Sequence, residues 1–208
     1  MSTLMLTHYA CIGHEPGKGH PESPNRLKSV ISTLEAETFN DLIRRVAPLG
    51  SIEQISRVHP RDHVEAVLDA IPTEGRRALD PDTIASPGSG DAALRAAGSA
   101  CTAVDAVLTG AANNAFCAVR PPGHHAEQAK SMGFCLFNSI AVGAEHARAE
   151  HGLTRVAVVD FDVHHGNGTQ AIFWDKADLF YASTHQYPFY PGSGSASDSG
   201  SGSDSATL

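Results

Sequence analysis

Apolar residues occur in short continuous runs typical of strands and at the three-to-four-residue spacing typical of helices. Together these patterns predict alternating strands and helices. The clearest strand is 155–161, where a continuous apolar run is typical of a buried parallel strand. The other predicted strands cover 3–10, 43–46, 115–119 and 179–184. Predicted helices cover 24–34, 52–58, 62–71, 92–108, 136–150 and 169–174, and a predicted loop rich in Pro and Gly covers 72–90. This alternation predicts an α/β fold with a mostly parallel sheet, in which active sites lie at the carboxyl ends of the strands.

Composition narrows the class of protein. The 208 residues suffice for one domain or two small ones, and 41% apolar with 18% charged residues is typical of a globular chain. The net charge of −8 argues against direct nucleic-acid binding, which needs a basic face. No apolar run approaches the roughly 20 residues of a membrane-spanning helix, and residues 1–7 lack the features of a signal peptide. We therefore expect a cytoplasmic protein without membrane contacts.

Acidic and histidine side chains follow the clearest predicted strand. Because side chains alternate along a strand, Asp160, Asp162 and His164 are expected on one face, with Phe161 and Val163 on the other. Two carboxylates and an imidazole at a buried strand end are costly unless a cation balances their charge. The alternative is a hydrogen-bonded polar strand end without metal. The oxygen and nitrogen donors suit zinc, whose catalytic sites use three protein ligands and one open position.

A second histidine pair follows another predicted strand. The turn Pro-Pro-Gly at 121–123 presents His124 and His125 side by side. Near a metal, one imidazole can accept a proton from bound water while the other holds charge. The alternative is a pair of polar loop histidines. Together with the acidic strand end, the pair indicates a metal-assisted hydrolase.

Four motifs, in this order, resemble those of the histone deacetylase family in the broad sense that includes acetylpolyamine amidohydrolases and acetoin-utilisation proteins. They are His-Pro-Glu-Ser-Pro-Asn-Arg at 20–26, Arg-Pro-Pro-Gly-His-His-Ala at 120–126, Gly-Phe-Cys-Leu-Phe-Asn at 133–138 and Asp-Phe-Asp-Val-His-His-Gly-Asn-Gly-Thr-Gln at 160–170. The last motif is closer to class II members and their bacterial relatives than to class I. The resemblance implies an arginase-like, three-layer α/β/α fold and zinc-dependent hydrolysis of an N-acetyl amide.

The resemblance also implies roles for individual residues. It assigns the zinc ion to Asp162 and His164. The other catalytic roles fall to His125 as general base, His124 as its electrostatic partner, Asp160 as the residue that orients His124, and Asn167 in the place of an Asp that partners the base in class I.

Further implied sites hold a second ion and the substrate. A potassium ion is expected at Asp160, with the side chain of Ser183 and the backbone of Thr184. The implied substrate contacts are Phe134 and Tyr190 as walls of a narrow acyl-lysine tunnel, Gly133 against the substrate chain, and Asp82 gripping the substrate backbone at the rim.

Two elements of the family pattern are absent from the 208 residues. One is the third zinc ligand, an Asp in a Gly-Phe-Asp segment, and the other is the oxyanion tyrosine of a Gly-Gly-Tyr segment. Residues 192–205 comprise seven Ser, four Gly, two Asp and one Ala, which predicts a flexible tail. We therefore expect 1–191 to be the N-terminal part of a deacetylase catalytic domain, incomplete at its C-terminus, followed by a Gly/Ser-rich tail at 192–208.

These observations leave competing hypotheses for function. The first is a zinc-dependent deacetylase that acts on N-acetyl amides of lysine side chains or polyamines. The second is a catalytically inactive, truncated relative that serves as a binding module. A manganese ureohydrolase of the arginase type ranks lower, because its Asp-x-His-x-Asp spacing needs a carboxylate where Gly166 stands. The acidic charge suits cationic polyamines and Lys-rich tails equally, and a homo-oligomer is compatible with the sequence.

Overall fold

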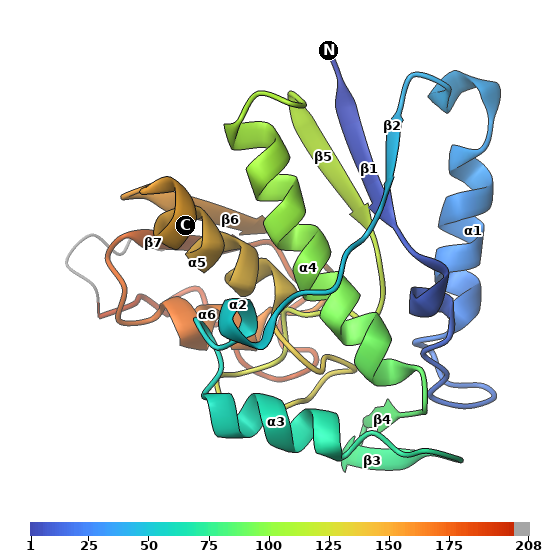
Figure 1. Ribbon diagram of the computed structural model, residues 1–208. Coiled ribbons are helices and arrows are strands. Elements are labelled where there is room, and N and C mark those ends of the chain that lie inside the picture. Colours follow the sequence, from blue (N-terminus) through green and yellow to red (C-terminus); the bar gives the residue numbers. More distant parts are fainter. Residues whose placement is uncertain (202–208) are drawn as a thin grey trace.

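Two groups of parallel strands form the sheet layer of the structure, a computed structural model that describes residues 1–201 (Figure 1). The first group has the order β2-β1-β5 and the second pairs β6 with β7. An antiparallel hairpin, β3–β4, lies apart from both. The strands are β1 (Thr3–Thr7), β2 (Ile43–Val46), β3 (Arg77–Asp80), β4 (Thr83–Ala85), β5 (Asn114–Ala118), β6 (Val156–Asp160) and β7 (Leu179–Ser183).

Helices pack on these strands and supply most of the core. They are α1 (Pro24–Leu34), α2 (Ile52–Ile55), α3 (Arg61–Asp69), α4 (Ser89–Leu108), α5 (Ser139–His151) and α6 (Asn167–Phe173), with short 3-10 turns at Tyr9–Ile12 and Glu37–Phe39. Strand β1 is buried between two helical layers. Its Leu4 and Leu6 belong to the apolar cluster that includes α4, and Met5 belongs to the cluster that includes α1. The predicted α/β class with a mostly parallel sheet is confirmed, and this half of the molecule has three layers.

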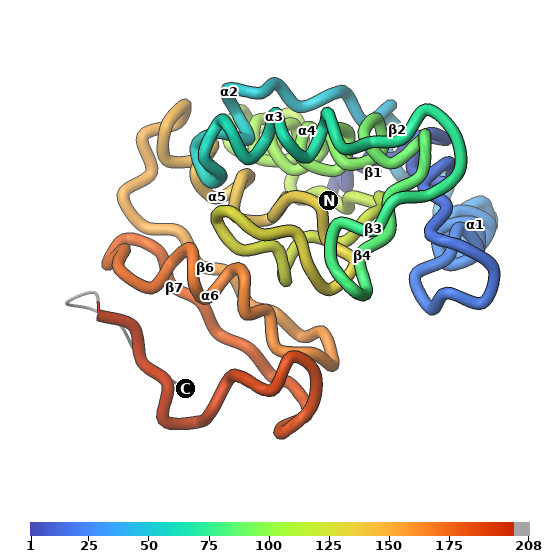
Figure 2. The backbone as a smooth tube through the Cα atoms, turned by 90° about the horizontal axis from the view of Figure 1, so that it is seen from below, coloured from blue at the N-terminus to red at the C-terminus, as the bar shows by residue number. Residues whose placement is uncertain are grey.

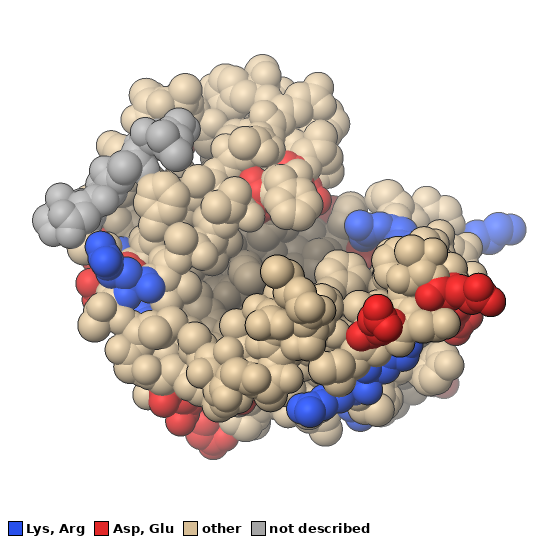
Figure 3. Space-filling view, turned by 90° about the horizontal axis from the view of Figure 1, so that it is seen from above, with Lys and Arg blue, Asp and Glu red and all other residues tan. Residues whose placement is uncertain are grey.

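The helical layer is continuous, whereas the strand layer is interrupted. Helix α4 packs along β1 and β5, α5 packs on β6, and the two helices contact each other. Within residues 1–201, however, no strand pairs with the free edges of β5 and β6, and Figures 1 and 2 show β6 and β7 set apart from β1 and β2. A cleft of about 630 Å³ runs along β6 toward the loop at 122–124. Seen from above, the surface is hollowed near its middle (Figure 3).

The interruption corrects one prediction about burial. The apolar run at 155–161 predicts a strand buried on both faces, but in the described structure Val159 is 64% exposed and Phe161 is 87% exposed. The strand also ends at Asp160, so Asp162 and His164 lie in bends rather than in the strand. The physical reason is that α5 and α6 cover only part of the β6–β7 pair, which has no further strand beside β6 among the described residues.

Other differences concern element boundaries. The predicted strand at 3–10 ends at Thr7, because the side chain of His8 accepts a hydrogen bond from the Ala10 amide and starts a 3-10 turn. The predicted loop at 72–90 contains the β3–β4 hairpin and the first residues of α4. The predicted helix at 52–58 ends at Ile55, and that at 136–150 begins at Ser139, where the Asn138 side chain caps it.

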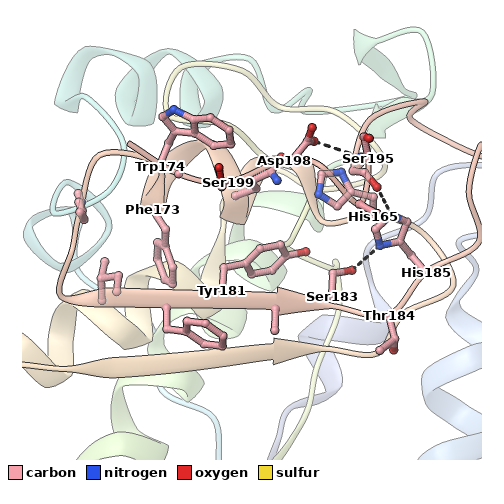
Figure 4. A pocket seen from close by; sticks show the side chains of 18 of the residues that line it. His165, Phe173, Trp174, Tyr181, Ser183, Thr184, His185, Ser195, Asp198 and Ser199 are labelled. Atoms are coloured by element: carbon pink, nitrogen blue, oxygen red, sulfur yellow. Dashed lines mark hydrogen bonds between the residues drawn. The ribbon is translucent and has the colours of Figure 1, made fainter. Parts of the chain in front are cut away.

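The Gly/Ser-rich segment begins against the domain. Ser193 Oγ lies 2.9 Å from His165 Nδ1, and the Gly194 carbonyl oxygen lies 2.9 Å from His185 Nε2. Farther along, the Ser201 amide donates a hydrogen bond to the Trp174 carbonyl oxygen. A pocket of about 420 Å³ lies between this segment, α6 and β7 (Figure 4). Residues 192–201 are thus held by the fold, the rest of the predicted tail lies outside the described residues, and the boundary at 191 stays a prediction.

None of the helices in the described part of the chain is long and apolar enough to cross a membrane. The cytoplasmic location and the homo-oligomer stay predictions.

A close crossing near Gly98 gives a testable consequence for stability. A Cβ atom at this position of α4 would overlap the Pro48 carbonyl oxygen and lie 2.5 Å from the Gly50 amide nitrogen. We expect Gly98→Ala to lower the free energy of unfolding by about 1–3 kcal/mol, although Ala is ordinarily the better helix former by about 1 kcal/mol. Urea denaturation measures the change. Gly90→Ala in the same helix is the control, because its Cβ would meet only side chains, the nearest at 3.2 Å. Equal stability of the two variants would contradict this expectation.

Candidate active site

The loops after β5 and β6 bring two histidines and an acidic segment together, as predicted. His125 is buried, and its Nδ1 lies 2.8 Å from Asn167 Oδ1. The Asn167 amide nitrogen donates to Glu127 Oε1 at 2.9 Å, which fixes the orientation of the amide. His125 Nδ1 therefore carries the proton and Nε2 has a free lone pair. Burial, with the neighbouring His124 and His164, lowers the pKa of His125 to about 4, so the ring is neutral near pH 7.

His124 is held in the same way by a carboxylate. Its Nδ1 lies 2.8 Å from Asp160 Oδ2. The Tyr181 hydroxyl donates to the same oxygen at 3.1 Å and accepts a hydrogen bond from the Gly166 amide. Burial alone would raise the pKa of Asp160, but hydrogen bonds from His124, the Asp162 amide and Tyr181 outweigh it and lower the pKa. Asp160 is thus an anion that orients His124, and Nε2 of His124 is left free.

Asp162 and His164, the predicted zinc ligands, lie side by side, and their binding of a metal stays a prediction. The Asp162 Oδ1 atom lies 3.1 Å from His164 Nδ1, and both side chains are partly exposed, 46% and 32%. His124 Nε2 is 4.0 Å from the same Asp162 oxygen. One oxygen and one nitrogen facing each other at this spacing fit two adjacent ligands of a zinc ion. Among residues 1–201, no third His, Cys, Asp or Glu ligand atom joins this pair.

Aromatic side chains surround the histidines. Tyr190 approaches His125 edge-on, with ring centroids 5.0 Å apart, and Phe189 stacks on His164 at 5.4 Å. Gly133 lies against His125 so closely that a Cβ atom there would overlap the imidazole ring. Phe134 follows Gly133 and contacts His20 edge-on. Phe134 and Tyr190 therefore lie in the neighbourhood predicted for a tunnel, and their contact with substrate stays a prediction.

The structure also places the remaining predicted residues. Asp82 lies at the β3–β4 turn, where its Oδ1 atom accepts hydrogen bonds from the Gly133 amide and the Thr83 hydroxyl. Ser183 pairs with Asp160 in the β6–β7 ladder, and the Thr184 amide donates to the Asp160 carbonyl oxygen. The Ser183 hydroxyl lies 2.8 Å from His185 Nδ1 (Figure 4). These three residues meet as expected, and a potassium ion between them stays a prediction.

A second His and Asp cluster lies elsewhere, between α4 and α5. Asp105 Oδ1 is 2.7 Å from Nε2 of both His146 and His151, a spacing that could hold a metal ion. Arg57 Nη1 is 2.8 Å from His146 Nδ1 and can only donate, so the proton of the neutral ring sits on Nε2. That proton points at Asp105. The cluster is therefore a set of hydrogen bonds that connects α4 with α5. A metal ion there would have to displace Arg57.

Comparison with known proteins identifies the family. A family model described as histone deacetylase domain matches residues 20–207. This chain belongs to the histone deacetylase family. It is 45% identical over 184 residues to a histone deacetylase-like amidohydrolase of Pseudomonas aeruginosa, covering 88% of this chain and 48% of that protein. It is 40% identical over 202 residues to a probable deacetylase of Methanothermobacter thermautotrophicus, covering 96% of this chain and 60% of that protein.

A solved structure agrees with these relatives. The crystal structure of the HDA15 HD domain superposes with a TM-score of 0.92 at 36% identity, and the match covers 96% of this chain and 58% of that chain. The arginase-like deacetylase fold is thereby confirmed for the described residues. This histone deacetylase family chain spans about half the length of the first curated relatives it matches.

Three supporting residues escaped the sequence analysis. Glu127 orients Asn167, Tyr181 holds Asp160, and Thr83 accepts a hydrogen bond from the Phe134 amide. Each is an ordinary polar or aromatic residue whose role depends on a partner distant in the chain. Only Glu127 lies next to a recognised motif, directly after the 120–126 segment.

Proposed function

We propose that this chain carries the metal-binding and acid–base part of a zinc-dependent deacetylase site that hydrolyses N-acetyl amides of lysine side chains or polyamines. One observation supports the proposal most strongly. Two adjacent imidazoles each have Nδ1 engaged by a side-chain oxygen, 2.8 Å away, and each has Nε2 free beside the Asp162–His164 pair. Such an arrangement prepares two proton acceptors at one edge of a metal site.

The proposed roles follow from what each imidazole touches. Asp162 and His164 would hold the zinc ion, which would supply polarisation of the acetyl carbonyl and a lowered pKa of water. His125 is the proposed base, because its partner Asn167 is neutral and its ring is uncharged near pH 7. His124 is the proposed electrostatic partner, because its Nδ1 lies 2.8 Å from the Asp160 carboxylate. The two histidines thus divide proton transfer and charge stabilisation.

We propose that the third zinc ligand and the oxyanion donor lie outside the described residues. Two protein ligands bind zinc weakly, since catalytic zinc sites use three. The cleft along β6 includes His124, Asp160 and Asp162, so a strand placed there in parallel would end beside the metal pair. The matched stretch covers only 48% of the Pseudomonas aeruginosa relative. A second copy of the chain is the other conceivable donor.

The alternative function is a catalytically inactive relative that binds partners. An incomplete ligand set favours it, whereas the intact hydrogen-bonded orientation of both histidines favours the enzyme. An inactive protein has no physical need for an imidazole tautomer fixed through Asn167 and Glu127.

Zinc binding by the purified chain tests the metal site. We expect Asp162→Ala and His164→Ala each to weaken zinc binding at least about tenfold, as measured by competition with a chromogenic chelator. Asp105→Asn is the matched control, because it removes the carboxylate of the cluster between α4 and α5 and should leave zinc affinity unchanged. The metal assignment is wrong if Asp105→Asn abolishes binding while the two site variants retain it.

Hydrolysis assays then separate the enzyme from the binding module. Acetyl-lysine peptides and N-acetylated polyamines are incubated with the zinc-loaded chain, and released acetate is quantified. Activity that is lost in His164→Ala supports the deacetylase. Stoichiometric zinc without release of acetate from either substrate class favours the inactive relative.

A further inference from the structure

The turn of the β3–β4 hairpin reaches into the candidate site from a distant part of the chain. Asp82 Oδ1 accepts hydrogen bonds from the Gly133 amide at 3.0 Å and from the Thr83 hydroxyl at 2.8 Å. Thr83 Oγ1 in turn accepts from the Phe134 amide at 3.1 Å. Two consecutive amides of the Gly133–Phe134 loop are therefore bound by two consecutive side chains of the hairpin.

This loop has a backbone that needs outside support. Gly133 has φ 58° and Phe134 has φ 68°, and Phe134 is the only residue other than glycine with positive φ among those described. A non-glycine residue in this region is strained and persists only where its surroundings enforce it. The enforced conformation seats Gly133 against His125, where no side chain would fit. The hairpin thus determines how the loop approaches the proposed base.

Asp82 also lies close to two further residues near the candidate site, Tyr190 and His20. Burial alone would raise the pKa of Asp82, but the hydroxyls of Thr83 and Tyr190 and the Gly133 amide outweigh it and lower the pKa. The Tyr190 ring packs edge-on against His125. His20 Nε2 lies 3.3 Å from the Asp82 carbonyl oxygen while its ring contacts Phe134. Asp82 therefore holds Gly133 directly and Phe134 through Thr83, and it lies beside Tyr190.

We propose that Asp82, acting with Thr83, is a positioning residue that fixes Phe134 and Tyr190 around His125 and so limits the site to a slender, unbranched acylated amine chain. The proposal rests on the proposed function for its substrate class. It differs from the contact predicted for Asp82, because the carboxylate is engaged inside the protein rather than directed at the substrate backbone.

Amide hydrogen exchange tests the anchor without requiring activity. In the full 208-residue chain, Asp82→Ala should speed exchange of the Gly133 and Phe134 amides about tenfold or more, since it removes a charged acceptor. Asp82→Asn keeps an acceptor oxygen and should restore most of the protection, and Thr83→Val should affect the Phe134 amide. Asp80→Ala, on the same hairpin, is the control and should change neither. Unchanged exchange in Asp82→Ala overturns the proposal.

Substrate selection provides the second measurement. Asp82→Ala should raise KM for acetyl-lysine more than it lowers kcat, and should reduce the preference for acetyl over a branched acyl group. Asp82→Asn should recover the preference. Equal KM increases in Asp82→Ala and Asp82→Asn, with normal amide protection, would mean that Asp82 binds substrate directly and would overturn the positioning role. If neither the wild-type chain nor any variant hydrolyses acetyl-lysine, the assay reports on the missing ligand or on the proposed function, and the exchange data alone decide the positioning role of Asp82.

Discussion

Replacing Glu22 with Gln should lower the free energy of unfolding by about 3–5 kcal/mol, the cost of leaving one partner of a buried ion pair uncompensated. Glu22 is fully buried and Arg120 nearly so. The carboxylate accepts two hydrogen bonds from the guanidinium, one of them at 2.6 Å from Nε. Arg120 also donates to the carbonyl oxygens of Cys11 and His14. Glu22→Gln removes the charge that balances Arg120 but preserves the shape of the side chain.

The same pair predicts a loss of stability in acid. Burial alone would raise the pKa of Glu22, but hydrogen bonds from His14 and Arg120 outweigh it and lower the pKa to about 2. The unfolded chain has the ordinary value of 4.5. A carboxyl group with a depressed folded-state pKa contributes stability that is complete above the unfolded pKa and is lost as pH falls. The contribution, of order 3 kcal/mol from the two pKa values, should therefore disappear between about pH 4.5 and pH 2.

Urea denaturation at pH 7 and at intervals down to pH 3 measures both effects. Glu65→Gln is the control, because it breaks an exposed pair with Arg61 and should cost less than about 1 kcal/mol. Glu22→Gln should also flatten the acid side of the stability profile. If the stability of the Glu22→Gln variant falls in acid as steeply as that of the wild type, another titratable group is responsible.

Replacing His125 with Ala should lower the rate of the proposed deacetylation by about 10²–10⁴-fold, the usual contribution of a general base. Zinc affinity should stay within a few-fold of wild type, because the ligands are assigned to Asp162 and His164. This separation of rate from metal binding distinguishes a base from a ligand.

Parallel zinc titrations and single-turnover assays on the same preparations provide the measurement. His20→Ala serves as the control, since His20 contacts Phe134 but none of the proposed proton acceptors, and its rate should fall much less. A His125→Ala protein that loses its zinc would contradict the assignment of His125 as base and would make it a ligand.

Local sequence patterns predicted the fold class. They also predicted that the candidate site residues lie at the carboxyl edge of the sheet, where the structure places them. Side chains at the ends of β5 and β6 converge because parallel strands share a carboxyl edge, and this geometry depends only on neighbouring residues. His124 meets Asp160, and His125 meets Asn167, as the motifs indicated. The boundaries failed where one side chain decides them, as at the Asn138 cap of α5.

The supporting contacts could not be predicted because they join residues far apart in sequence. Glu127 is 40 residues from Asn167, Tyr181 is 21 from Asp160, and Asp82 is 51 from Gly133. No periodicity encodes such pairs. The exposure of β6 was likewise missed. An apolar run indicates that a strand is suited to burial, but it does not specify which elements pack beside that strand.

Because the sheet is interrupted, His124 and His125 of the candidate site also hold its two halves together. Within the described residues, the β5 half and the β6 half are joined at one end by α4 against α5, where Gly143 allows close contact with Ala100. At the other end they are joined by the site itself, through His124 with Asp160, His125 with Asn167, and the Thr169 amide with the His124 carbonyl oxygen. By linkage, any ion or substrate that tightens these bonds also tightens the union of the two halves. Binding at the site is therefore expected to stabilise the contact between the two halves.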